Sequence, residues 1–144
     1  MKERGRYNNF WGNWKVGEGT TIGSFCDITG TIGKNCKIQS YVFMCPGVEM
    51  GDNVFIGPGT IFTNDKFPKA DNPDFVPLKT IVKDGARIGA GCIIAPGITI
   101  GSNSFIGMGS LVLNDIPDGE RWFGRPAIFN CPMGYDKCIQ CGHC

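Results

Sequence analysis

Histidine, the side chain most often used for proton transfer near neutral pH, is almost missing from this chain. Its single histidine, His143, is the second-last residue. A Ser-His-Asp site and a catalytic zinc held by histidines are therefore both excluded from the body of the chain.

Cysteine is the second chemically capable residue type, with 8 copies. Cys26, Cys36, Cys45 and Cys92 occur among apolar residues, where free cysteine usually fills a small core position. The tail holds a different pattern, C-x6-C-x2-C-x2-C, with His143 inside it. Successive C-x2-C steps favour metal over a disulfide, so we predict a zinc knuckle, the alternative being a reduced extension. Its ligands would be Cys131, Cys138, Cys141 and Cys144.

A polar pair in the middle of the chain, Asn64 and Asp65, opens a segment unlike its surroundings. Residues 65–78 read DKFPKADNPDFVPL, with three prolines and no periodicity. A loop of this length within a compact domain is usually functional or disordered. Here two phenylalanines can anchor the loop, while Lys66 and Lys69 are placed to meet an anion. The pair itself could simply open a turn, because both residue types favour turns.

These residues are carried by an internal repeat with a period of six. Every sixth position from Ile32 to Phe62 and from Val82 to Val112 is apolar, often with glycine next, and a small or β-branched residue lies four places on. A period of six fits neither a helix nor an alternating strand. Short extended sides joined by tight turns explain it, and three sides close a coil of about eighteen residues.

The expected fold is therefore all-β, a solenoid of about five coils with parallel strand pairing. It carries one protruding loop, residues 65–78, and ends in a C-terminal cap and tail. We expect residues 1–127 to form the solenoid with its cap, and residues 128–144 to form the cysteine-rich tail. A glycine-rich β-sandwich is the alternative, but it would show irregular turn spacing.

Composition narrows the range of partners. The chain of 144 residues has the length of one domain, and its net charge of +1 gives no electrostatic argument for nucleic acid or an anionic membrane. Residues 1–10 are charged and polar, and no apolar run approaches the length of a membrane span. We expect a cytoplasmic protein.

The repeat resembles that of the hexapeptide-repeat acyltransferases, which are left-handed parallel β-helices. FTND followed by Phe-Pro, together with IQSYVFMCPGV (38–48), NVFIGPGTIFTND (53–65) and DGARIGAGCIIAPGITIG (84–101), is similar to the members that acetylate 3-amino or 4-amino sugars linked to UDP or dTDP. The resemblance covers residues 16–127. It implies an acetyl-CoA-dependent N-acetyltransferase that acts as a homotrimer.

Within this resemblance, Asn64 would hold the sugar amine against the thioester, and Asp65 would accept its proton or bind a sugar hydroxyl. The missing histidine agrees with acylation of an amine. An α-amino group has a pKa of about 7.7 to 8.0, so a comparable sugar amine is partly neutral without a general base. A hydroxyl needs such a base.

The resemblance also implies that CoA lies along a groove between two subunits, against small residues. The candidates are Gly89, Ala90, Ala95 and Gly107, with Arg125 as the preferred contact for the CoA phosphates. Gln39, Tyr41, Lys66 and Lys69 are candidates for the nucleotide sugar. Lys69 stands where related enzymes often have arginine, and lysine cannot grip a phosphate bidentately.

Two other functions fit the same repeat. An O-acetyltransferase of a small hydroxyl metabolite is disfavoured by the missing histidine. A non-catalytic assembly module would bind no acetyl-CoA and would not need the loop at residues 65–78.

Overall fold

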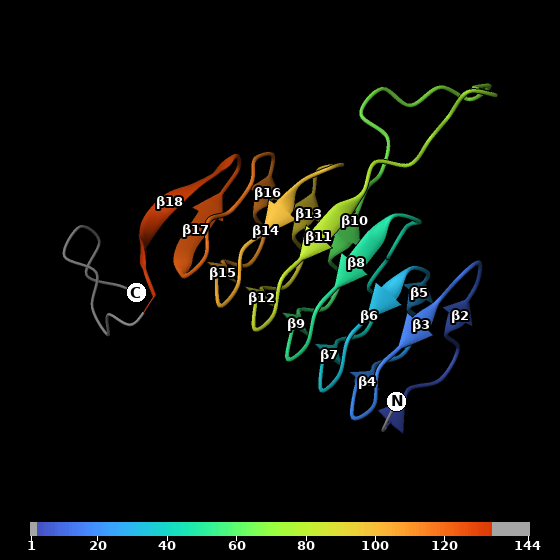
Figure 1. The fold of residues 1–144 in the computed structure, drawn as a ribbon, viewed down its shortest axis with the longest axis horizontal. Helices are drawn as coiled ribbons and strands as arrows, with labels where there is room; N and C mark the ends of the chain where they lie inside the picture. Colours follow the sequence, from blue (N-terminus) through green and yellow to red (C-terminus); the bar gives the residue numbers. More distant parts are fainter. Residues whose placement is uncertain (1–2, 134–144) are drawn as a thin grey trace.

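The computed structural model describes residues 3–133, and within this range the chain forms only strands, bridges and turns. Short strands follow one another around a three-sided coil, and the coils stack along one axis (Figure 1). Strands of successive coils pair in parallel, and only the last pair is antiparallel. The expected all-β parallel solenoid is confirmed, with the architecture of a left-handed β-helix.

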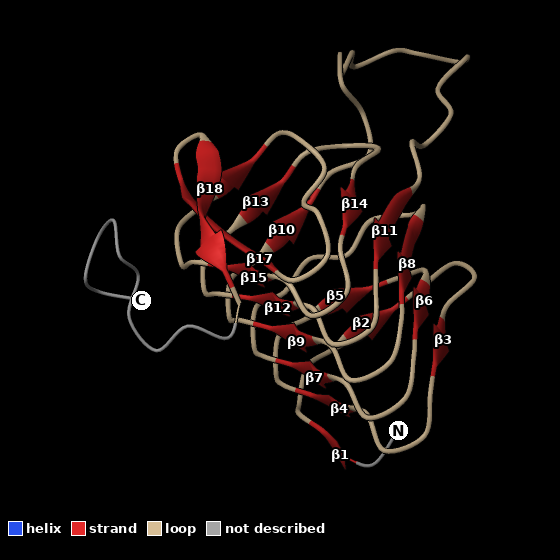
Figure 2. Cartoon of the chain, turned by 60° about the vertical axis from the view of Figure 1, so that its left-hand side comes forward, coloured by secondary structure: helices blue, strands red, loops and turns tan. Residues whose placement is uncertain are grey.

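Three sheets form the three sides of the solenoid (Figure 2). Sheet A contains β1 (Glu3–Arg4), β4 (Thr21–Ile22), β7 (Lys37–Ile38), β9 (Phe55–Ile56), β12 (Arg87–Ile88), β15 (Phe105–Ile106), β17 (Glu120–Gly124) and β18 (Ala127–Pro132). Sheet B contains β2 (Asn9–Phe10), β5 (Asp27–Ile28), β10 (Ile61–Phe62), β13 (Ile93–Ile94) and β16 (Leu111–Val112), joined across its middle by single bridges through Phe43. Sheet C contains β3 (Lys15–Val16), β6 (Thr31–Ile32), β8 (Val48–Met50), β11 (Thr80–Val82) and β14 (Thr99–Ile100).

The apolar positions of the repeat form the core. In sheet A the strand register places Ile38 beside Ile22 and Ile56, and Ile88 beside Ile56 and Ile106. All five side chains are buried. The small residues four places on are buried as well, namely Thr20, Cys26, Cys36, Val42, Val48, Val54, Thr60, Ala86, Cys92 and Ile98. The hexapeptide period therefore predicted the interior correctly.

The described chain makes six coils rather than about five. The additional coil is the first, residues 3–16, whose strands pair with those of the second coil. Its inward positions Phe10 and Val16 are only partly buried, because no earlier coil covers them. The apolar repeat is broken in this coil at Arg4, which pairs with Ile22 at a position that is apolar in the later coils, so the sequence pattern did not reveal a sixth coil.

The expected loop at residues 65–78 protrudes from the solenoid between β10 and β11 (Figure 1). After the loop the chain returns in register, since Val82 pairs with Met50 of the preceding coil and Ile100 of the following coil. At the C-terminal end the β17–β18 hairpin covers the last coil. Strand β18 continues past residue 127 to Pro132.

Candidate functional site

The corner between sheets A and B, hereafter the A–B corner, has one residue per coil with a left-handed backbone. These residues are Tyr7, Phe25, Tyr41, Gly59, Gly91 and Gly109, with φ between 58° and 71°. Hydrogen bonds connect the corner from coil to coil, as from Tyr41 N–H to the Ser24 carbonyl and from Gly91 N–H to the Pro58 carbonyl. The six residues therefore form one column along the solenoid.

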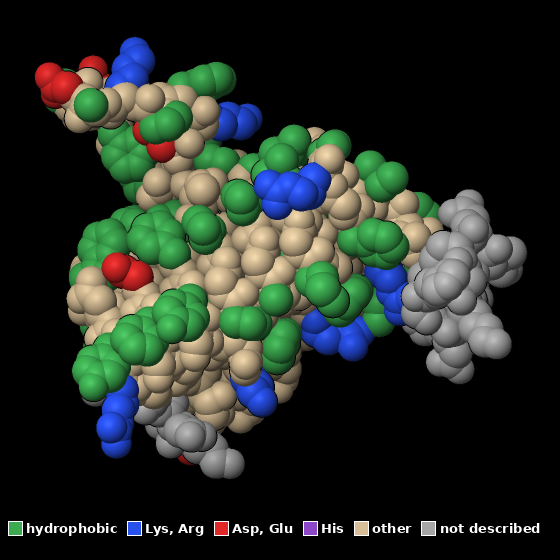
Figure 3. Space-filling model, turned by 180° about the vertical axis from the view of Figure 1, so that it is seen from behind, with side chains coloured by type: hydrophobic (Ala, Val, Ile, Leu, Met, Phe, Trp, Pro, Cys, Tyr) green, Lys and Arg blue, Asp and Glu red, His purple; other side chains and the backbone are tan. Residues whose placement is uncertain are grey.

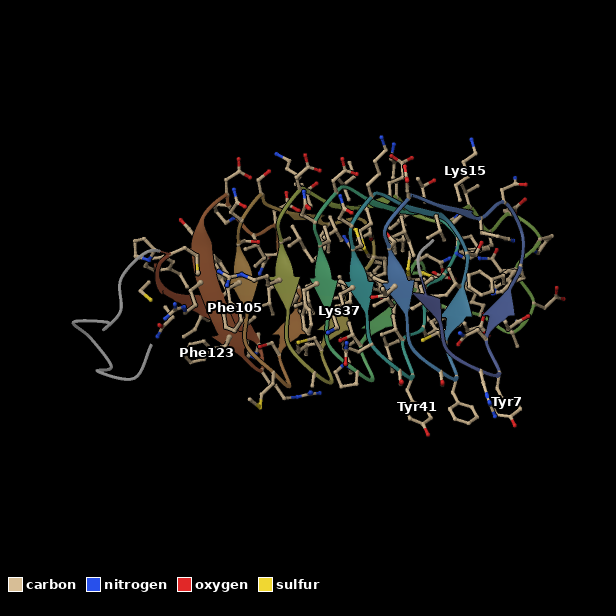
Figure 4. The ribbon with its side chains drawn as sticks, turned by 90° about the horizontal axis from the view of Figure 1, so that it is seen from below. Tyr7, Lys15, Lys37, Tyr41, Phe105 and Phe123 are labelled. Atoms are coloured by element: carbon tan, nitrogen blue, oxygen red, sulfur yellow. The ribbon has the colours of Figure 1, made fainter. Side chains whose placement is uncertain are left out.

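The first three members of this column form a stacked aromatic ladder, comprising Tyr7, Phe25 and Tyr41. The ring centroids of Tyr7 and Phe25 are 5.3 Å apart, and those of Phe25 and Tyr41 are 5.2 Å apart, with planes tilted by 17° and 9°. Exposed fractions of 76%, 50% and 63% show that the ladder faces solvent. Figure 4 shows Tyr7 and Tyr41 projecting from the same corner.

The last three members form the glycine column, comprising Gly59, Gly91 and Gly109. A Cβ added at any of the three would have no atom within 4 Å. The left-handed backbone favours glycine here, and the missing side chains leave open space above the backbone. A ligand can therefore approach the main chain closely along three consecutive coils.

Gly89 and Gly107, predicted as cofactor contacts, have a different reason to be glycine. A Cβ on Gly89 would lie 2.6 Å from Met108 N, and one on Gly107 would lie 2.6 Å from Phe123 Cβ. Close stacking of the coils excludes a side chain at these positions. The residues open to a ligand lie two places further on in each coil, and they are not among the predicted cofactor contacts. A comparison of equivalent positions could have found them, since glycine in the last three coils replaces the aromatic residues of the first three.

The backbone at this corner also has unsatisfied hydrogen-bond donors. In the first coils Arg6 N–H and Ser24 N–H donate to the Ser24 and Ser40 hydroxyls, at 3.0 Å in both cases. Further along, Ser40, Ala90 and Met108 N–H donate to no described residue, and Pro58 has no N–H. Predicted residue Ala90 therefore lies within a row of free donors.

The corner between sheets C and A provides a contrast. There Asp52, Asp84 and Asp118 side chains accept the corresponding N–H groups of Lys34, Asp52 and Ser102 at 2.7–2.8 Å. Free donors are thus not inherent to a solenoid turn. They occur at the A–B corner because the next coil presents proline, methionine or glycine instead of an acceptor side chain.

Arg125 lies at the C-terminal end of the glycine column. Its Nη1 donates a hydrogen bond of 3.1 Å to the Gly109 carbonyl, and its side chain is exposed. The β17–β18 hairpin positions it, since Arg125 lies in the turn between the two strands. The A–B corner thus offers open backbone and free donors that lead to a guanidinium, the combination that suits an extended ligand with acceptors and a phosphate.

Asn64 and Asp65 lie at another corner, between sheets B and C, in the fourth coil. Asn64 Nδ2 donates to the Pro46 carbonyl at 2.9 Å, and the Asn64 carbonyl accepts from Leu78 N–H at 3.0 Å. Asp65 Oδ1 accepts from Phe67 N–H at 2.9 Å. Both residues hold the base of the loop, so the turn interpretation describes part of their role. Asn64 Oδ1 accepts no hydrogen bond from the described residues.

The predicted site residues therefore occupy two corners of the chain. Gln39, Tyr41, Gly89, Ala90, Gly107 and Arg125 lie at the A–B corner, and Asn64, Asp65 and Ala95 lie at the corner between sheets B and C, with Lys66 and Lys69 exposed on its loop. Ala95 packs partly buried against the core. Sheet B separates the two groups, so a single chain does not bring them together.

A separate depression of about 440 Å³ lies on sheet C and contains none of the predicted site residues. Glu49 and Ile81 of the strands and the adjacent Lys83 line it, and Glu49 is already paired with Lys79 at 2.8 Å. It lacks the open glycine backbone of the A–B corner.

A family model named "Bacterial transferase hexapeptide (six repeats)" matches residues 29–64 and 79–114, which is half of the chain. The chain belongs to the hexapeptide transferase family. The gap between the two matched segments is residues 65–78, the protruding loop, so the family repeat is interrupted at the same place as the solenoid. No curated protein matches the sequence of this transferase.

Solved structures share the transferase's fold. AntD, an N-acyltransferase from Bacillus cereus whose mutant was solved with dTDP and coenzyme A, is 24% identical, with a TM-score of 0.80 over 90% of this chain and 83% of that one. A mutant perosamine N-acetyltransferase from Caulobacter crescentus, with CoA and GDP-perosamine, is 22% identical, with a TM-score of 0.73 over 85% and 52%. The acetyltransferase domain of PglB from Neisseria gonorrhoeae, with acetyl coenzyme A, is 19% identical, with a TM-score of 0.74 over 88% and 56%.

The transferase spans about half the length of the last two chains. The prediction of a hexapeptide-repeat transferase is confirmed by the family match, and the predicted β-helix is confirmed by the fold shared with these structures. Within residues 3–133 there is no helix of the length and apolar character that a membrane crossing requires.

The buried cysteines of the transferase are core residues. Burial raises the pKa of the Cys26, Cys36 and Cys92 thiols, and it raises the pKa of Cys45 to about 11. A protonated thiol is a poor nucleophile and a poor metal ligand. The described residues contain no group of three or more side chains able to hold a metal. Of the predicted zinc ligands Cys131 is buried, and Cys138, Cys141 and Cys144 lie outside the described residues.

Proposed function

We propose that this transferase is an acetyl-CoA-dependent N-acetyltransferase that acylates the amino group of a UDP- or dTDP-linked sugar. The observation that carries the proposal is the A–B corner, where the glycine column and its free N–H donors end at Arg125. The structures of similar fold support it, since their ligands include CoA, acetyl-CoA, dTDP and GDP-perosamine.

The corner sets the direction in which acetyl-CoA binds. Arg125 pairs with the CoA phosphates, and the Met108 and Ala90 N–H groups donate to the carbonyls of the pantetheine arm. Coils are about 4.8 Å apart, so an arm lying over Gly109 and Gly91 brings the thioester to Gly59, about 10 Å from Gly109. Pro58 has no N–H, which leaves Ser40 N–H as the nearest free donor for the thioester oxygen.

The chemistry requires positioning rather than a strong base. The amine lone pair attacks the thioester carbon, the C–S bond breaks, and the amine proton leaves to solvent or to Asp65. Asn64 Oδ1 has no hydrogen bond from the described residues and is free to accept one from the amine. Holding the two reacting groups together lowers the barrier by several kcal/mol.

A homotrimer brings the two groups of site residues together. The A–B corner of one subunit then faces the loop corner of its neighbour, so that Asn64 approaches the thioester across the subunit boundary. Lys66, Lys69 and Gln39 are the residues proposed to bind the nucleotide sugar. Cytoplasmic localisation and zinc in the tail remain predictions.

The direct test combines purified protein, acetyl-CoA and a panel of UDP- and dTDP-amino sugars, with products identified by mass spectrometry. We expect the amino sugar to give a product that is heavier by about 42 mass units, the gain from one acetyl group. The hydroxyl analogue should give no product. Acetylation of the hydroxyl analogue would indicate an O-acetyltransferase. No CoA binding by calorimetry would indicate an assembly module.

Substitution of Asn64 tests the site within the same assay. Asn64→Ala should lower kcat by about 100-fold, because a misplaced amine loses its alignment with the thioester. Asn114 follows β16 as Asn64 follows β10, so Asn114→Ala is the matched control and should retain wild-type turnover. Equal rates for the two variants would remove Asn64 from the mechanism.

A further inference from the structure

The aromatic ladder ends where the glycine column begins. Phe25 covers one face of the Tyr41 ring, at 5.2 Å between centroids. On the other side the next member of the column is Gly59, with nothing within 4 Å of its Cβ position. A ligand that lies along the glycine column therefore runs directly toward the bare face of Tyr41.

Tyr41 has an unfavourable backbone conformation, and its ring is stacked on a neighbouring ring. An L-residue with a side chain adopts a left-handed backbone only at an energetic penalty, and Tyr41 does so at φ 63°. Glycine occupies the same position in the next three coils without this penalty. The stack with Phe25 and Tyr7 fixes the ring across the column, although 63% of Tyr41 is exposed.

We propose that Tyr41 is the stop for the acyl group and makes the enzyme specific for short acyl-CoA donors. This inference rests on the proposed function, in which Arg125 and the free donors place the thioester over Gly59. The aromatic ring lies one coil from this point. An acetyl methyl fits against the ring face, whereas a longer chain meets the ring and is forced out of the column.

The spacing of the ladder supports this limit. Successive rings are 5.2–5.3 Å apart, so a group centred over Gly59 is already one ring spacing from Tyr41. Carbon atoms in contact are about 3.5–4.0 Å apart, which leaves room for little more than a methyl group between the thioester and the ring. The alternative occupant is a nucleobase stacked on Tyr41, which would displace the thioester from Gly59.

Calorimetric binding of acetyl-CoA, hexanoyl-CoA and dTDP tests the proposal without knowledge of the sugar. Tyr41→Gly should fold, because glycine accepts this φ freely. The control is Tyr7→Gly, which removes an equivalent ring two coils further from the glycine column. We expect the wild type and Tyr7→Gly to bind acetyl-CoA at least about tenfold more tightly than hexanoyl-CoA.

In Tyr41→Gly the affinity for hexanoyl-CoA should rise by about tenfold, while the affinities for acetyl-CoA and dTDP stay within about twofold. If the affinity ratio of acetyl-CoA to hexanoyl-CoA were the same in Tyr41→Gly and the wild type, the proposal would be overturned. A selective loss of dTDP binding would also overturn it, and would assign Tyr41 to the nucleobase. A wild-type protein that binds neither acetyl-CoA nor hexanoyl-CoA would overturn the proposed function itself. This outcome differs from an unchanged affinity ratio, which would overturn only the role of Tyr41.

Discussion

Arg125 distinguishes one end of the glycine column from the other. It is exposed and donates to the Gly109 carbonyl, at the end of the column where the hairpin covers the last coil. Lys37, Arg87 and Arg121 lie on sheet A instead, where Figure 4 shows Lys37 and Phe105. The guanidinium carbons of Arg87 and Arg121 lie 5.6 and 5.7 Å from the centre of the Phe105 ring. Arg125 is therefore proposed as the phosphate contact because of its position at the end of the column as well as its charge.

Arg125→Ala should weaken CoA binding by about tenfold at low salt, since an exposed charge-assisted contact contributes modestly and is screened by salt. Pantetheine, which has no phosphate, should bind the variant and the wild type equally. Calorimetry with both ligands measures the difference. An equal loss for the two ligands would show that Arg125 acts on the shape of the corner rather than on the phosphates.

Cys45 gives the protein a pH dependence of stability. Its pKa is raised by burial from 9.0 to about 11, so the folded thiol stays protonated where the unfolded thiol ionises. Stability from this group is complete below pH 9 and falls as the pH rises toward 11, by up to about 2 kcal/mol.

Urea unfolding at pH 8 and pH 10.5 measures this loss, with Cys45→Ala compared at each pH because tyrosines and lysines titrate in the same range. The decline should be smaller in Cys45→Ala than in the wild type. Parallel declines would show that another group is responsible.

Among the elements, the corners differ more than the strands do. The strands repeat one pattern, an inward apolar residue followed by a turn, and this pattern could be predicted from the sequence because burial imposes it on every coil. The roles of glycine could not. Gly89 and Gly91 are two residues apart and look equivalent in the sequence, but the first is required by stacking and the second lies under open space.

Neither the first coil nor the full candidate site could be predicted from the sequence. Arg4 stands where the repeat calls for an apolar residue, as its pairing with Ile22 shows, so the first coil lacks the continuous signal of the others. The candidate residues for CoA and for the amine lie on different corners, and in the proposed trimer they meet only through a neighbouring chain, which a single sequence does not describe. Asn64 and Asp65 were found because the break in periodicity at the loop is visible.

Substitutions at the A–B corner should separate the two roles of glycine. Gly91→Asn should fold with little loss, since asparagine tolerates the left-handed backbone and its side chain enters open space. It should weaken CoA binding by at least about tenfold by filling the column. Gly89→Ala should instead lower the free energy of unfolding by about 1–3 kcal/mol, because its Cβ would lie 2.6 Å from Met108 N.

Thermal unfolding and CoA titration of both variants measure the two effects. Tight CoA binding by a folded Gly91→Asn protein would place CoA elsewhere on the surface.

The surface of the whole molecule carries many exposed hydrophobic side chains. Phe43, Ile61 and Leu113 are 37%, 41% and 49% exposed on or beside sheet B, and hydrophobic side chains lie across the face seen in Figure 3. Sheet B also lies between the two groups of site residues. Subunit contact over this face would cover apolar surface and complete the site at once.

Mixed trimers should reveal a site built from two chains. At an acetyl-CoA concentration well below saturation, Asn64→Ala and Gly91→Asn should each have little activity alone, because one misplaces the amine and the other weakens CoA binding. In trimers co-expressed from equal amounts of both, about a quarter of the sites receive an intact corner and an intact Asn64. Activity near this fraction of the wild type is expected. Recovery of no activity, in trimers verified by light scattering, would place the whole site within one chain.

The return of β11 into register after residues 65–78 has a consequence for how such enzymes diversify. The Asn64 carbonyl and Leu78 N–H close the base of the insertion, and the coil continues with Val82 beside Met50 and Ile100. The loop therefore leaves and rejoins the solenoid without shifting the strand register of the coils. The loop can thus differ in length and composition without a shift of the coils, and under the proposed function this would change the acceptor sugar while the CoA-binding corner stays the same.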